Sequence, residues 1–122
     1  MPALTADYST IEGISRALAL ASDELANMAD AVARARQIRD YDSDRRKRAL
    51  SLAVRDFLSE GDSATSAEHK ARSSDSYQEM MKQTGMDLIR AEKTIADYDA
   101  CKIRWETARS LLSVQKQIVG NL

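Results

Sequence analysis

The sequence is poor in turn-forming residues and in aromatic residues. Its 122 residues include four glycines and one proline, and aromatic residues account for 5%. Sheet proteins need many turn residues, so this scarcity argues against a β-rich fold and predicts a single all-helical domain over residues 1–122. Hydrophobic residues make up 43%, but many are alanines, which favours thin helical packing over a thick globular core.

Cysteine, histidine and long apolar segments are also scarce. Cys101 is the one cysteine and His69 the one histidine, so an internal disulfide framework is excluded and a reducing compartment is favoured. No run approaches the ~18 apolar residues that a membrane span requires, so we expect no membrane partner. The first residues do not combine a basic segment with an apolar one, and we therefore expect no signal peptide and a cytoplasmic location.

The charges nearly balance overall but are unevenly distributed. The formal net charge is −1, which argues against a general basic nucleic-acid binder. Residues 1–33 hold one basic and five acidic residues, whereas residues 34–55 hold eight basic and three acidic residues. This asymmetry singles out residues 34–55 as the region where a charged partner would bind.

The hydrophobic pattern predicts a first long helix over about residues 9–59. Its apolar residues recur at spacings of three and four, as in a coiled coil: Ile11, Ile14, Leu18, Ala21, Leu25, Met28 and Val32. The same spacings then place Arg39, Asp42 and Arg46 on this stripe, before it becomes apolar again at Leu50.

A second long helix is predicted over about residues 76–119, after a polar connection at 60–75 that forms a short helix or a loosely packed segment. Its stripe is the strongest pattern in the chain: Tyr77, Met81, Thr84, Leu88, Ala91, Ile95, Tyr98, Cys101, Trp105, Ala108, Leu112, Gln115 and Val119. Two long helices with a short connection fold back on each other most simply. The expected fold class is therefore all-α, a long antiparallel helical hairpin or coiled coil.

Serine, threonine and glycine mark the predicted helix ends. Capping boxes begin at Ser9, Thr65 and Ser76, each followed three residues later by a glutamate. Gly61 is expected to end the first helix, because glycine readily adopts the left-handed conformation found at helix C termini.

A hairpin of two helices leaves apolar side chains uncovered, so we expect a homo-oligomer. Ile38 and Leu52 lie on a face of the first helix away from its main stripe. Trp105 and Leu112 are further candidates for the oligomer interface. Because Trp105 is at a stripe position, packing is its first expected role, and contact with an outside partner is the alternative.

The basic segment is the candidate binding site for nucleic acid or for an acidic protein partner: Arg34, Arg39, Tyr41, Arg45, Arg46, Lys47, Arg48 and Arg55. At ~100° per residue, four of its arginines fall within about a quarter-turn, interleaved with Tyr41 and Leu52. Guanidinium groups bind phosphates, and tyrosine can stack on a base of a single strand. Alternatively, these arginines pair with acidic residues of the second helix or of a neighbouring copy.

Charged residues within the stripe of the first helix also need partners, because burying them unpaired is costly. Asp42 stands three residues from Arg39 and four from Arg46, so the trio can pair within its own helix. One positive charge is then left over, and three alternatives stay open. The hairpin could splay there, acidic residues of the second helix such as Asp87 and Glu92 could approach, or the segment could face a solvent-filled or ligand-filled channel in an oligomer.

No pattern in the sequence indicates an enzyme. There is no Gly-rich phosphate loop, zinc pattern or serine elbow. His69 and Cys101 lie on different segments, which argues against a nucleophilic pair. We expect no catalytic residues, no metal site and no cofactor.

Three segments resemble those of short all-helical proteins common in tailed-phage genomes: RQIRDYD (36–42), SEGDS (59–63) and RWETARSLLSVQK (104–116). The chain is also similar to the UvsY-type recombination mediators, small helical oligomers that bind single-stranded DNA and help load a recombinase. The resemblance implies a non-enzymatic phage accessory protein for recombination or replication, acting in the host cytoplasm. The alternative class is a protein-interaction module, such as an inhibitor, adaptor or assembly factor, that acts through coiled-coil contacts.

Overall fold

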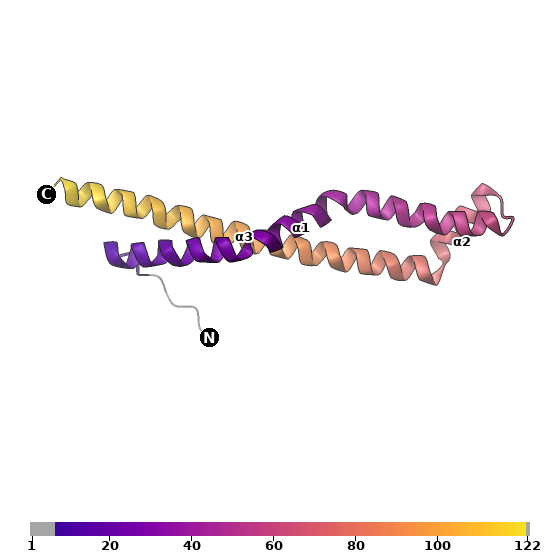
Figure 1. Cartoon of the computed structure of the whole chain (residues 1–122), viewed down its shortest axis with the longest axis horizontal. Coiled ribbons are helices and arrows are strands. Elements are labelled where there is room, and N and C mark those ends of the chain that lie inside the picture. The colour runs from indigo at the N-terminus through magenta and orange to yellow at the C-terminus, as the bar shows by residue number, and fades with distance from the viewer. Residues whose placement is uncertain (1–6, 122) are drawn as a thin grey trace. The chain divides into compact units, whose positions relative to one another are not determined.

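The computed structural model describes residues 7–121 and contains three helices in that range. They are α1 (Ile11–Ser59), α2 (Ala64–Ser73) and α3 (Asp75–Gly120). The two long helices pack antiparallel, with α2 in the connection between them (Figure 1). This confirms the predicted all-α hairpin and the short-helix interpretation of the connection. The expectation that the chain begins without a signal peptide rests largely on residues 1–6, which lie outside the described residues.

The long helices contribute to two compact units. Unit 1 comprises Met1–Val32 and Thr94–Leu122, and unit 2 comprises Ala33–Lys93. Unit 1 holds five basic and eight acidic residues, so its formal charge is −3, whereas unit 2 holds thirteen basic and eleven acidic residues and has a charge of +2. The units therefore offer surfaces of opposite net charge.

The core of unit 1 is built from the predicted stripes of both helices. Its buried residues share small or branched apolar side chains: Ile14, Ala21, Val32, Ile95, Cys101 and Ala108. Tyr98, Trp105, Leu112 and Gln115 are half-buried beside them. The stripe of the second helix is thereby confirmed as far as Gln115, whereas Val119 is 53% exposed.

The core of unit 2 is thinner and consists almost entirely of alanine: Ala35, Ala49, Ala67, Ala71 and Ala91. The one buried polar residue is Thr84, whose hydroxyl donates to the backbone carbonyl of Met80 at 2.8 Å and is satisfied within its own helix. Alanines bury few methyl groups, so unit 2 gains little from hydrophobic burial at each position.

The first helix begins one residue later than the predicted capping box. Thr10 accepts the hydrogen bond from the Gly13 amide at 2.9 Å, so Thr10 and not Ser9 is the cap. The Ser9 hydroxyl and amide instead donate to the carboxylate of Asp7. These bonds lower the pKa of the Asp7 carboxyl below its usual value. The Ser9 side chain is thus directed to Asp7, and the Thr10 hydroxyl accepts from the first turn of the helix.

The predicted N-caps Thr65 and Ser76 are also wrong, because each helix is capped by a serine two residues earlier. Ser63 caps α2 by accepting from the Ser66 amide at 3.3 Å. Ser74 both ends α2 and begins α3: its amide and hydroxyl donate to the Ala71 carbonyl, and its Oγ accepts from the Tyr77 amide at 3.4 Å. One residue in an extended conformation serves both helices, which shortens the connection to a single residue.

The predicted end of the first helix at Gly61 is confirmed. Gly61 has a φ of +98°. Its amide donates to the Leu58 carbonyl at 3.1 Å, and the Asp62 amide donates to the Phe57 carbonyl at 3.3 Å. These two bonds form a Schellman motif, which satisfies carbonyls at the helix end. Lys70 of α2 then binds the Asp62 carboxylate at 2.8 Å and holds the turn against α2.

Gly61→Ala should lower the free energy of unfolding by about 1–2 kcal/mol, because an L-residue is strained at positive φ. Space is not the cause, since an added Cβ meets no atom within 4 Å. Gly120→Ala is the matched control, because its Cβ also meets open space and its φ is not positive. Urea unfolding followed by circular dichroism measures both variants, and equal midpoints for the two would contradict the assignment.

Candidate functional site

The predicted binding residues separate into two groups in unit 2. One group shares an exposed face of α1 and is called the basic row here: Arg34, Tyr41, Arg45, Arg48, Leu52 and Arg55. Tyr41 is 56% exposed and Leu52 is 44% exposed. The structure thus brings together four of the predicted arginines and the two interleaved side chains, and all six are open to solvent.

The arginines of the basic row differ in their partners. Arg45 binds the Asp87 carboxylate of α3 at 3.3 Å. Hydrogen bonds from Gln83, and then from Arg45, hold the pKa of the Asp87 carboxyl below its usual range. Arg34, Arg48 and Arg55 form no ion pair with any residue in the range 7–121. These three guanidinium groups are therefore available to an external anion.

The second group lies off this face. Arg39 is exposed and binds the neighbouring Asp40 at 3.2 Å, and Lys47 is also exposed. Ile38 is half-buried, so it takes the stripe position that the regular spacing assigned to Arg39. The expected stripe is wrong at this point, because a shift of one residue buries an apolar side chain and leaves the guanidinium in water.

Asp42 and Arg46 do occupy the inner stripe. They form an ion pair there, and the Arg46 guanidinium lies beside Met81 and Gly85 of α3. Arg46 Nε donates to Asp42 Oδ2 at 2.9 Å, and the Asp42 side chain is only 16% exposed. The guanidinium extends over α3, with Nη1 4.0 Å from Met81 Sδ and Nη2 4.0 Å from where a Cβ of Gly85 would lie. Asp42 Oδ1 is buried and accepts no hydrogen bond from the described residues. The pair therefore forms within α1, as one alternative predicted, but it is incompletely satisfied.

Replacing both charges with Asp42→Leu/Arg46→Leu should leave the urea midpoint unchanged or raise it, because apolar side chains fit the stripe without a desolvation cost. Asp42→Leu alone should lower the midpoint, since Arg46 then keeps its half-buried position without a partner. Glu68→Leu/Arg72→Leu removes a comparable pair from the surface of α2, where both side chains are more than half exposed, and should change little. A double variant less stable than the single one would contradict this account.

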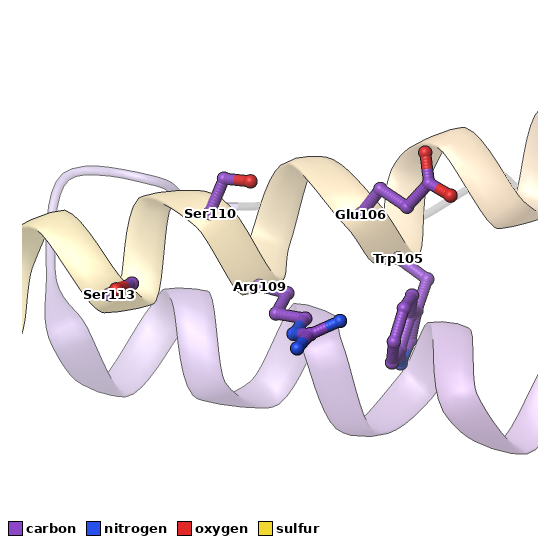
Figure 2. Close-up of a pocket in the computed structure, with 5 residues that line it drawn as sticks. All are labelled: Trp105, Glu106, Arg109, Ser110 and Ser113. Carbon is purple, nitrogen blue, oxygen red and sulfur yellow. The ribbon is translucent and has the colours of Figure 1, made fainter.

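Trp105 and Leu112, two predicted interface residues, are half-buried in unit 1. Figure 2 shows Trp105 and Arg109 directed toward α1, whereas Glu106 and Ser110 point away from it. The Arg109 guanidinium lies 5.3 Å from the centre of the Trp105 ring, a cation–π contact. An open groove on α3 is lined by Trp105, Glu106, Arg109, Ser110 and Ser113. The groove contains one carboxylate and two hydroxyls, but none of its other lining residues is a general base that could activate a hydroxyl. It therefore offers packing and polar contacts.

Cys101 is a buried thiol on the inner stripe of unit 1. Its side chain is 0% exposed, and Sγ donates to Glu24 Oε2 at 3.4 Å and to the Ala21 carbonyl at 3.6 Å. Burial, and then the Glu24 carboxylate, raise the pKa of the Cys101 thiol above its usual value. Arg104 binds the same carboxylate at 3.2 Å. A protonated, inaccessible thiol suits packing and not nucleophilic chemistry.

His69 is exposed on α2. Among residues 7–121, no three His, Cys, Asp or Glu side chains come close enough together to hold a metal ion. Within the same range, none of the helices combines the length and apolar character needed to cross a membrane.

One exposed surface was missed by reasoning from the sequence. Uncharged residues at spacings of three and four follow the outer face of α3 in unit 1 and form what we call the outer row: Ala96, Ala100, Ile103, Thr107, Ser110, Val114 and Ile118. Ile103 is 62% exposed, and Val114 and Ile118 are 50% and 52% exposed. The signal was present as a second periodicity, hidden by the stronger inner stripe of the same helix.

Comparison of the chain with protein-family models, with curated proteins and with solved structures gives no match. The assignment of a function therefore depends on the basic row and the outer row themselves.

Proposed function

We propose that the chain is a non-enzymatic phage accessory protein that binds single-stranded nucleic acid in recombination or replication. The observation that supports binding is that three exposed arginines on one face of α1, Arg34, Arg48 and Arg55, form no ion pair with the described residues. Each guanidinium presents several N–H donors in a plane, which matches the oxygens of a phosphate. The phage context and the host cytoplasm as the place of action come from the resemblance of the sequence.

A single strand fits the basic row better than a duplex. Tyr41 lies between Arg34 and Arg48 along α1 and is 56% exposed, so its ring is open to stacking. Only an unpaired base offers its face to such a ring, whereas phosphates are available in both forms. Arg48 and Arg55 are seven residues apart, or about 10.5 Å along the helix, so they reach separate phosphates.

Arg48→Ala/Arg55→Ala should weaken binding to a labelled single strand of about 30 nucleotides, measured by fluorescence anisotropy at several salt concentrations. Each lost phosphate contact reduces the slope of log K against log salt by about 0.7, so the double variant should lose about 1.4. The matched control is Arg16→Ala/Arg72→Ala, which removes the same charge from two arginines paired within their own helices. An equal loss in both variants would mean that binding depends on net charge alone. If the wild type does not bind the strand at low salt, the proposal is refuted.

A second candidate is the protein-interaction module, and the outer row is the observation that favours it. Exposed apolar residues at spacings of three and four suit the packing of a further amphipathic helix. Ile103, Val114 and Ile118 supply these apolar side chains, and Thr107 and Ser110 lie between them without adding charge. In this function the chain would act as an inhibitor, adaptor or assembly factor through coiled-coil contacts.

Ile103→Asp/Val114→Asp should abolish capture of a specific host protein in affinity purification, because charge cannot be buried in a helix–helix contact. Arg48→Ala/Arg55→Ala should retain the same protein, which separates the outer row from the basic row. Identical sets of captured proteins with both variants would count against the outer row as a docking surface.

A further inference from the structure

We propose that unit 1 holds a second binding site for single-stranded nucleic acid, on one flank of α3 at Lys102, Arg109 and Lys116. All residues of this site belong to unit 1, whereas the basic row belongs to unit 2. The second site rests on the proposed function for its class of ligand, but it shares no side chain with the basic row.

Unit 1 has five basic residues in the range 7–121, and two of them are engaged in ion pairs. Arg16 binds Glu12 at 3.3 Å, and Arg104 binds Glu24 at 3.2 Å. The remaining three are Lys102, Arg109 and Lys116. They are exposed and form no ion pair with the described residues. The cations of unit 1 that are available to an external anion therefore all lie on α3, although this unit has a net negative charge.

These three cations form one straight series on α3, which we call the lateral row. Each is seven residues from the next, or about 10.5 Å along the helix, and the direction of the side chains drifts by only about 20° per step. A strand that runs along α3 therefore meets the three cations in succession. At this separation each cation reaches a phosphate of its own, and each contact releases counterions from the strand.

The lateral row lies on the flank of α3 opposite to Arg104. The contact of Arg104 with Glu24 of α1 fixes which flanks of the two helices meet on that side. On the other side, the helical spacing places Ser15, Ser22 and Ala26 of α1 next to the lateral row. These side chains are small and uncharged, so they leave the flank open and add no negative charge to it.

The groove on α3 follows the middle of the lateral row, with Trp105, Arg109 and Ser113 among its lining residues. The Arg109 guanidinium lies over the Trp105 ring at 5.3 Å from its centre, and both side chains are directed toward α1 (Figure 2). A guanidinium plane next to an aromatic ring suits the stacking of an unpaired base. The Ser113 hydroxyl can donate to a phosphate oxygen. The one carboxylate of the groove, Glu106, points away from α1 (Figure 2).

An acidic protein helix fits the lateral row less well than a single strand does. A helix that docks on another helix needs exposed apolar side chains to pack against. The exposed apolar residues of this part of α3, Ile103, Val114 and Ile118, belong to the outer row, and Trp105 is half-buried beside α1. Binding of nucleic acid depends instead on phosphate contacts and base stacking, for which the lateral row has suitable side chains.

Trp105 gives a direct readout of this site, because it is the one tryptophan of the chain. Lys102 and Lys116 are about 21 Å apart along α3. A DNA strand of about eight thymidines covers this length even at ~3.4 Å per nucleotide. At low salt this strand should quench the tryptophan emission of the wild type, since a base that stacks beside the ring changes its surroundings.

Lys102→Ala/Lys116→Ala should lose this quenching at strand concentrations that saturate the wild type. The slope of log K against log salt, taken from the quenching, should fall by about 1.4. Lys102→Arg/Lys116→Arg should be quenched as the wild type is, because it keeps both charges. The matched control is Lys82→Ala/Lys93→Ala, which removes two exposed lysines from the part of α3 in unit 2 and should also keep the quenching. Circular dichroism verifies that each variant retains its helices.

Four results would overturn the second site. They are unchanged emission of the wild type at low salt, undiminished quenching in Lys102→Ala/Lys116→Ala, an equal loss in the control, and equal quenching by an oligoglutamate of the same length. The last result would indicate an acidic protein partner.

The variant Arg48→Ala/Arg55→Ala separates the failure of the second site from the failure of the proposed function. Its emission should still be quenched, because its substitutions lie in unit 2. If this variant binds the longer labelled strand as the wild type does, while quenching requires Lys102 and Lys116, the basic row fails and the lateral row stands. If this variant binds the longer strand weakly and the short strand quenches no protein, the basic row stands and the lateral row fails.

Discussion

The small size of the side chains between α1 and α3 is the constraint on which the rest of the structure depends. The buried stripe positions are dominated by alanine: Ala21, Ala35, Ala49, Ala91 and Ala108. Helices that meet through such residues pack closely but bury few methyl groups at each position. A pair of helices also covers only one face of each. Consequently the basic row and the outer row are both left on the surface, where their side chains are available to other molecules.

Ion pairs contribute less than this stripe to holding the hairpin together. Glu24–Arg104 in unit 1 and Arg45–Asp87 in unit 2 connect the two helices, but these side chains are partly exposed, and such pairs contribute about 0.2–1 kcal/mol each. The more buried pair, Asp42–Arg46, forms within α1 and cannot fix the register between the helices. The spacing of the inner stripe, and the caps that limit each helix, therefore set the register.

The hairpin and the approximate ends of its long helices could be predicted from the sequence, because a heptad stripe is a repeated signal and Gly61 is a specific one. The helix starts could not be located to the residue. Each lies in a segment with several serines or threonines, and the backbone of the preceding turn decides which hydroxyl oxygen accepts from the helix, as at Thr10 and Ser74. The expected stripe contained Arg39 where the structure has Ile38, and this error has a related cause. A regular spacing ignores the one-residue shift that buries an apolar group and keeps a charge in water.

The candidate binding surfaces were harder to predict, because the basic row has no apolar pattern and the periodicity of the outer row is hidden by the stronger inner stripe of the same helix. The basic row was found from its charge. The sequence could not show that Arg34, Arg48 and Arg55 form no ion pair with the residues 7–121, because the partner of an exposed guanidinium depends on which acidic side chain of either helix comes within reach.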